Sequence, residues 1–201
     1  MYTRNYLSSF KSGLDNTIFE HNKELIEGEE FFNKLIEKID KKSRLFFYGN
    51  GASMAFSIHM ALDWFKNAKI QAHALGDVSL LTALVNDYSR DKMYTEHFKL
   101  FDPCENDVLC VISSSGNSAN IVEVLNYGLE LNCTTVGFSG LNVSNKVRSF
   151  SDFSVYVPFK TYGMVESAHQ ILLHLWLDKF MQIKEWDRQG SQNMDFENLR
   201  F

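Results

Sequence analysis

The segment VLCVISSSGNS at residues 108–118 indicates the fold class most clearly, because an apolar run passes directly into a turn of serine, glycine and asparagine. The apolar part predicts a strand, and residues 119–131 then follow a helical pattern. The same order occurs earlier, where LFFYGNGAS at residues 45–53 leads into a helical stretch that extends to about residue 67. A strand, a turn and a helix are therefore repeated along the chain.

Three further strands are expected at residues 69–75, 134–138 and 153–157, and further helices near 78–86, 90–101 and 162–184. About five strands that alternate with helices predict a parallel sheet covered by helices on both faces. The expected fold class is α/β, a three-layer αβα sandwich around a five-stranded parallel sheet.

The first 40 residues differ from this pattern. Residues 2–40 contain no proline, and their apolar residues recur at helical spacing, so we expect a lead-in of two helices. Such helices cannot bury an apolar stripe alone and must pack on the main domain or on copies of themselves. The chain thus divides into a helical, oligomerising lead-in over 1–40, a main domain over 41–184 and a polar tail over 185–201.

Composition narrows the class of protein. The 201 residues carry a net charge of −5 and are 45% hydrophobic, which suits one globular domain and gives no general attraction to nucleic acid or to an anionic membrane. The N-terminus lacks an apolar signal core, and no stretch approaches the roughly 20 apolar residues of a membrane span. We therefore expect a cytoplasmic protein. The three cysteines follow no disulfide or metal-binding spacing.

Both turns are expected at the carboxyl ends of strands, where helix N-termini favour an anion. Serine hydroxyls can hold a phosphate monoester without positive charge, and Gly116 permits a close backbone approach. The polar and glycine positions of the two turns are Asn50, Gly51, Ser53, Ser113, Ser114, Ser115 and Ser118. Ordinary turn and helix-capping chemistry is the alternative. No nucleotide cofactor is expected, because the first turn lacks the dinucleotide-binding glycine spacing.

Two expected helices carry histidine and carboxylate side chains. His59 and Asp63 are four residues apart and share one helix face, while Glu166 and His174 are eight apart with His169 between them. Such a set can ligate a divalent metal or move a proton. His59 alone is also compatible with a core histidine. A carboxylate in the apolar helix around Asp63, however, calls for a partner.

These segments resemble the SIS-domain sugar isomerases, and within them the sedoheptulose 7-phosphate isomerases, over about residues 40–184. The resemblance rests on the first turn, on LLTALVNDY at residues 80–88, on SSGNS at 114–118 and on VESAH at 165–169 with the later histidine. It implies that Ser53, Ser113, Ser115 and Ser118 hold a sugar phosphate and that Asp87 lines the sugar pocket. It also implies metal or acid/base roles for His59, Asp63, Glu166 and His174, with zinc as the first candidate, and a homotetramer.

The chain departs from the family pattern at several positions. Asp63 is one methylene shorter than the family's glutamate, and Glu166 replaces a glutamine. Asn67 stands where the family has an arginine, Gly163 where it has an aspartate, and Ala52 where it has a glycine. A carboxylate moved by about 1 Å is a serious change for proton transfer, since catalytic geometry tolerates little displacement. The departures leave the expected phosphate pocket intact, but they concern the identity of the sugar that it would bind.

The expected function is an aldose–ketose isomerase that acts on a phosphorylated sugar, similar to sedoheptulose 7-phosphate, through an enediol. Asp63 would remove the proton next to the carbonyl and His174 would donate or relay a proton, with a metal polarising the carbonyl. The product would serve heptose synthesis for a surface polysaccharide. Two alternatives stay open: a non-catalytic SIS module that binds a sugar phosphate or bridges partner proteins, and a lyase or deaminating isomerase of an amino sugar phosphate.

Overall fold

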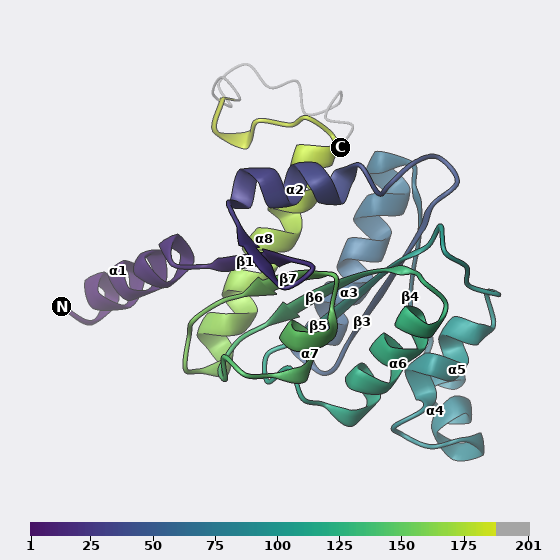
Figure 1. Ribbon diagram of the computed structural model, residues 1–201. Helices are drawn as coiled ribbons and strands as arrows, with labels where there is room; N and C mark the ends of the chain where they lie inside the picture. Colours follow the sequence, from purple (N-terminus) through teal and green to yellow (C-terminus); the bar gives the residue numbers. More distant parts are fainter. Residues whose placement is uncertain (188–201) are drawn as a thin grey trace, which may run out of the picture.

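The computed structural model describes residues 1–187, and its centre is one seven-stranded sheet in the order β2-β1-β7-β6-β5-β3-β4 (Figure 1). The strands are β1 (Ile18–His21), β2 (Glu24–Ile26), β3 (Arg44–Gly49), β4 (Gln71–Ala74), β5 (Val108–Ser113), β6 (Thr134–Ser139) and β7 (Phe153–Tyr156). The helices are α1 (Tyr2–Asp15), α2 (Gly28–Ile36), α3 (Ala52–Asp63), α4 (Val78–Asp87), α5 (Met93–Lys99), α6 (Ala119–Glu130), α7 (Lys146–Phe150) and α8 (Tyr162–Phe180). A π-helical turn at Trp64–Ala68 continues α3.

The five strands expected from the sequence are present and parallel, in the order β4-β3-β5-β6-β7. Their register places Cys110 of β5 between Phe47 of β3 and Val136 of β6. The prediction of an α/β sandwich with a parallel sheet is confirmed. The prediction of five strands in total is wrong, because β1 and β2 extend the sheet.

The two additional strands come from the segment that was expected to be helical. Asn22 and Lys23 both have positive φ angles, 51° and 69°, which is the geometry of a two-residue hairpin turn between antiparallel strands. Strand β1 then pairs antiparallel with β7, with Phe19 opposite Val155. Glu20 of β1 accepts two hydrogen bonds from Arg148 at 2.7 and 2.8 Å. The expectation of a purely helical lead-in therefore fails between residues 18 and 26.

Helices cover both faces of the sheet and enclose two separate cores. Alternate residues of each strand point to opposite faces, so Leu45 and Phe47 belong to one core while Phe46 and Tyr48 belong to the other. Helices α2, α3 and α8 pack over the first core. There the rings of Trp64 and Trp176 pack edge to face, with their centroids 5.1 Å apart. Helices α4, α5 and α6 supply the second core.

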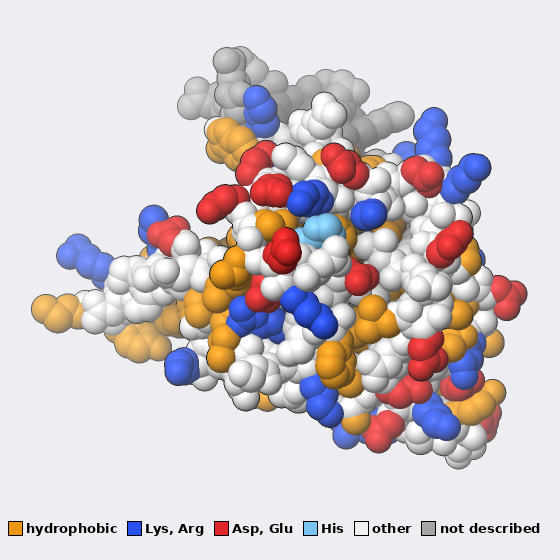
Figure 2. All heavy atoms as spheres, in the orientation of Figure 1, with side chains coloured by type: hydrophobic (Ala, Val, Ile, Leu, Met, Phe, Trp, Pro, Cys, Tyr) orange, Lys and Arg blue, Asp and Glu red, His pale blue; other side chains and the backbone are white. Residues whose placement is uncertain are grey.

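Helix α1 lies outside this layered body and projects from it (Figure 1), and none of its 14 residues is buried against the described part of the chain. Hydrophobic side chains are visible along it, whereas basic and acidic side chains intermingle over the rest of the face shown in Figure 2. Helix α8 ends at Phe180, earlier than the expected 184, because Gln182 has a φ of 58°.

Most of the expected polar tail lies outside the described residues. No helix among residues 1–187 is long and apolar enough to cross a membrane. The three cysteines are free; Cys110 and Cys133 are buried, whereas Cys104 is exposed.

Candidate active site

The two turns meet at one edge of the sheet, because β3 and β5 are neighbours and Gly49 pairs with Ile112 at their carboxyl ends. They form a pocket of about 90 Å³ between the turns and the start of α8. Its lining residues are Asn50, Ser53, Ile112, Ser113, Ser114, Ser115, Ser118, Tyr162 and Glu166. The pocket brings together all the expected substrate-binding positions except Gly51 and Asp87. Tyr162 also lines the pocket, and the sequence analysis did not identify it as a site residue.

The shape of the serine turn depends on Gly116. This residue has a φ of +64°, and a Cβ atom built on it would lie 2.0 Å from Oδ1 of Asn145. Asn145 is fully buried and cannot move aside, since its side chain donates to Ser139 Oγ and to the carbonyl of Asn142 and accepts from the backbone of Arg148. A glycine is required at this position both for the backbone angle and for the space.

The pocket is suited to an anion although it contains no basic side chain among the described residues that line it. Helices α3 and α6 both begin at its rim and carry no acidic residue in their first turns, so their N–H groups favour a negative charge. Ser118 occupies the capping position of α6, yet its side chain makes no capping hydrogen bond within the described chain. Helix capping alone therefore does not explain this serine.

Side-chain hydrogen bonds join the two turns. The amides of Asn50 and Asn120 exchange two hydrogen bonds, at 2.9 and 2.8 Å, between the glycine turn and the first turn of α6. The phenol of Tyr94 donates to the carbonyl of Gly49. Burial raises the pKa of Tyr94 to about 12, so the phenol stays protonated and remains a donor at neutral pH. The sequence analysis missed both Asn120 and Tyr94, because their partners are distant in the chain.

A second cluster lies on the facing sides of α3 and α8. The side chains of His59, Asp63 and His174 offer ligand atoms that all lie within 4.8 Å of one another. Nε2 of His59 is 3.2 Å from Oδ2 of Asp63, and the two imidazole rings are 5.2 Å apart. We call these three residues the trio. They border a cavity of about 490 Å³, which Asn67 also lines.

The trio fits a divalent cation of the zinc type. Two imidazole nitrogens and one carboxylate are the donors that catalytic zinc sites commonly provide, together with an open position. The same three groups could also act as acid and base, since a carboxylate and an imidazole stand within reach of one bound molecule.

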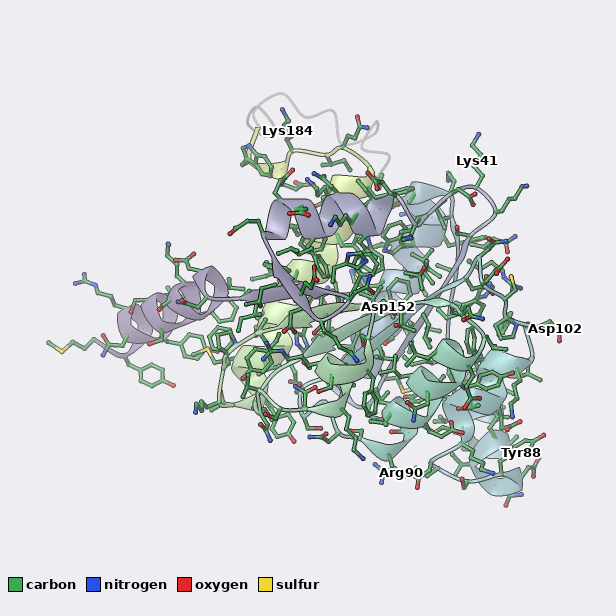
Figure 3. The ribbon with its side chains drawn as sticks, in the orientation of Figure 1. Lys41, Tyr88, Arg90, Asp102, Asp152 and Lys184 are labelled. Carbon is green, nitrogen blue, oxygen red and sulfur yellow. The ribbon has the colours of Figure 1, made fainter. Side chains whose placement is uncertain are left out.

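Two expected site residues lie elsewhere. Glu166 is eight residues before His174 on α8, roughly 12 Å along the helix axis, and it lines the serine pocket rather than joining the trio. Asp87 ends α4, is exposed and does not line the pocket, and the next residue, Tyr88, lies at the outer edge of the molecule (Figure 3). Among the described residues of one chain, three of the four expected metal-ligating residues therefore come together, namely His59, Asp63 and His174.

The third histidine of this region, His169, is structural. It is fully buried and its Nε2 lies 3.1 Å from the carbonyl oxygen of Ser139. Burial lowers the pKa of His169 to about 4, so the ring is neutral at physiological pH and donates this hydrogen bond.

Comparisons with known proteins identify relatives of the chain over most of its length. The SIS domain family matches residues 5–140. The phosphoheptose isomerase of Pelobacter propionicus is 31% identical over 151 residues, which cover 72% of this chain and 79% of the relative. That of Clostridium acetobutylicum is 33% identical over 147 residues, covering 70% and 73%.

Solved structures share the fold. The phosphoheptose isomerase of Francisella tularensis superposes with a TM-score of 0.76 at 19% identity and covers 90% of this chain and 97% of its own. The corresponding protein of Neisseria gonorrhoeae gives a TM-score of 0.74 at 22% identity, covering 91% and 100%. Together with a family match over more than half of its residues, this similarity shows that the chain belongs to the SIS-domain family.

Proposed function

We propose that this protein is an aldose–ketose isomerase of a phosphorylated sugar, with sedoheptulose 7-phosphate as the first candidate substrate. The observation that carries the proposal is that an anion pocket and an acid/base cluster share the same two helices. Ser53 and His59 are six residues apart on α3, roughly 9 Å along its axis. An extended seven-carbon sugar phosphate is roughly 10 Å long, at about 1.3 Å of length per bond. Its phosphate and its carbonyl could thus occupy the two places together.

The proposed mechanism uses the chain's own groups. The serine hydroxyls and the helix N–H groups bind the phosphate. The Asp63 carboxylate removes the proton from the carbon next to the carbonyl, and His174 gives a proton to the carbonyl oxygen, so that an enediol forms. Asp63 then returns its proton to the former carbonyl carbon, while the hydroxyl on the other carbon gives its proton back to His174 and becomes the new carbonyl. If a zinc ion is bound, His59, Asp63 and His174 would hold it, and its polarisation of the carbonyl would take the place of proton donation by His174.

The test is isotope exchange in D₂O, followed by NMR, with zinc-loaded protein and a panel of sugar phosphates that begins with sedoheptulose 7-phosphate. We expect deuterium next to the carbonyl and formation of the isomer, both lost in Asp63→Asn. The control is Asp91→Asn, which changes an exposed aspartate outside both clusters. A sugar phosphate that binds in the serine pocket without any exchange would contradict the proposal.

A non-catalytic sugar phosphate sensor or scaffold is the second candidate. The observation that favours it is the short reach of Asp63, whose carboxylate already contacts His59 and Asn67. This candidate predicts stabilisation by the sugar phosphate without turnover. The same experiment also examines a deaminating reaction, which would release ammonia from an amino sugar phosphate.

We further propose a homotetramer that works in the cytoplasm and feeds heptose into a surface polysaccharide. Support for association comes from α1, which exposes Tyr2 and Leu7. Light scattering coupled to gel filtration would give the mass, and a monomer would refute the tetramer. Loss of heptose from the surface polysaccharide after gene disruption is the test of the cellular role.

A further inference from the structure

Two of the three cysteines meet at the amino ends of the parallel strands, opposite the serine pocket, and the proposed function does not use them. Cys104 lies in the loop before β5, and Cys133 directly precedes β6. Although they are 29 positions apart, the thiol of Cys133 donates a hydrogen bond to the carbonyl oxygen of Cys104 at 3.2 Å. The main chain joins the same two segments, because the amide of Thr134 donates to the carbonyl of Asp107 at 3.0 Å.

This separation is compatible with a disulfide bond. A sulfur 3.2 Å from the carbonyl oxygen of the other cysteine places the two Cα atoms at most about 8 Å apart. Disulfides span Cα separations of about 4.4–6.8 Å, so the possible range overlaps the required one. The side chain of Cys104 is exposed, and rotation about its Cα–Cβ bond turns its sulfur toward Cys133 without rearrangement of the core.

The surroundings of Cys104 are those of a reactive thiol. Two hydrogen bonds of 2.8 and 2.6 Å hold the guanidinium of Arg44 on the carboxylate of Asp107. These bonds are the main reason why the pKa of Arg44 is raised, and a hydrogen bond to Cys104 adds to the effect. Asp102, in the same loop, lies at the outer edge of the molecule (Figure 3). Reactive cysteines in proteins are accessible thiols beside a cationic side chain, and Cys104 meets both conditions.

The other two cysteines differ from Cys104 in ways that assign the order of reaction. Burial raises the pKa of Cys133 to about 12, so this thiol is protonated at neutral pH and is not the group that an oxidant attacks first. Cys110 is fully buried within β5, and its pKa is raised well above the ordinary value by burial. Cys110 is therefore an internal reference for a thiol that stays reduced in the folded chain.

We propose that Cys104 and Cys133 are a modification site, at which hydrogen peroxide forms an intramolecular disulfide. The thiolate of Cys104 attacks one peroxide oxygen, the O–O bond breaks, and hydroxide leaves and becomes water with the thiol proton. The sulfur of Cys133 then attacks the sulfenic acid of Cys104. The S–S bond forms, the S–O bond breaks, and the hydroxyl leaves as a second water with the proton of Cys133. Two thiols are oxidised and one peroxide is reduced.

The disulfide fastens the ends of two helices that support the phosphate pocket. Cys104 follows α5 and Cys133 follows α6. The first turns of the same helices carry Tyr94 and Asn120, which bond to Gly49 and Asn50 in the glycine turn. Closing a loop of about 30 residues restricts the unfolded chain, so the Tm of the oxidised protein should be roughly 7–14 °C higher than that of the reduced protein.

The experiment maps the disulfide chemically. Purified protein is treated with increasing hydrogen peroxide, the remaining thiols are alkylated, and the peptides are identified by mass spectrometry. We expect a peptide pair joined through Cys104 and Cys133, while Cys110 becomes alkylated only after unfolding. In Cys133→Ser, dimedone should trap Cys104 as its sulfenic acid, and in Cys104→Ser the thiol of Cys133 should stay reduced. Cys110→Ala is the matched control and should form the same disulfide as the wild type.

Thermal unfolding with and without dithiothreitol measures the effect on stability, and Cys133→Ala replaces the serine variant if the latter does not fold. A disulfide to Cys110 or between two chains would overturn the proposal. Sulfinic acid at Cys104 with Cys133 still free in the wild type would also overturn it, as would an unchanged Tm after the disulfide has formed. None of these measurements depends on isomerase activity, so the proposal and the proposed function stand or fall separately.

Discussion

Replacing Asn120 by alanine should weaken the phosphate pocket as well as the fold. Asn120 is 2% exposed, and its amide exchanges two hydrogen bonds with Asn50 across the pocket rim. Each such bond contributes about 1 kcal/mol net, so the free energy of unfolding should fall by about 2 kcal/mol. For a chain of this size that corresponds to a fall in Tm of roughly 4–8 °C.

The substitution should also weaken sugar phosphate binding, independently of its effect on global stability. Asn50 lines the pocket, and without its partner the glycine turn is no longer held against α6. Loss of one hydrogen bond to a charged phosphate is worth about 1.5 kcal/mol or more, so the Kd for a sugar phosphate should rise about tenfold. Asn120→Asp keeps the acceptor but places a carboxylate near the bound anion, and it should lose more affinity than stability.

Urea denaturation and isothermal titration with sedoheptulose 7-phosphate measure the two effects independently. Asn106→Ala is the matched control, because Asn106 is exposed and lies at the opposite edge of the sheet, before β5. If Asn120→Ala loses stability while the Kd stays unchanged, the amide pair merely fastens two segments and does not position the pocket.

Three further outcomes are expected. Glu166→Gln removes the one charge among the described pocket-lining residues and should tighten sugar phosphate binding about threefold by calorimetry, since exposed charge interactions are worth up to about 1 kcal/mol; weaker binding would show that the carboxylate contacts the sugar. Gly116→Ala should lower the free energy of unfolding by more than about 2 kcal/mol, because a left-handed backbone costs an alanine 1–2 kcal/mol and its Cβ would meet Asn145; a stable variant would refute the packing argument. Burial lowers the pKa of His97 and of His169 to about 4, below the unfolded value of 6.5, so the unfolded chain binds more protons between these values. Stability should therefore fall as pH decreases from 6.5 to 4, by up to about 1.4 kcal/mol per pH unit for each ring, and His169→Asn should flatten that dependence in urea titrations.

The local parts of the fold could be predicted because each is encoded within a few adjacent residues. The apolar runs at 45–48 and 108–112 identify strands, and the serine turn identifies the start of a helix. The hairpin at 18–26 could not be recognised in this way. Its strands have four and three residues, and β1, on which β2 pairs, is held to the sheet by β7, more than 130 residues later.

The candidate site likewise has a part that the sequence could predict and a part that it could not. The spacing of His59 and Asp63 places them on one helix face whatever surrounds them, and the structure brings them together at 3.2 Å. Glu166 shares the α8 face of His174, so helical periodicity predicts that it joins the same cluster. In the structure it lines the serine pocket instead.

Local sequence is sufficient to predict the parallel α/β core, the serine pocket at the ends of β3 and β5, and the pairing of His59 with Asp63, because backbone propensity and residue spacing act over one or two turns of chain. Three features arise only on folding: the antiparallel extension of the sheet, the amide pair of Asn50 and Asn120, and the approach of His174 to His59 and Asp63. These features depend on contacts between segments far apart in the chain, and such contacts exist only after the layers have packed.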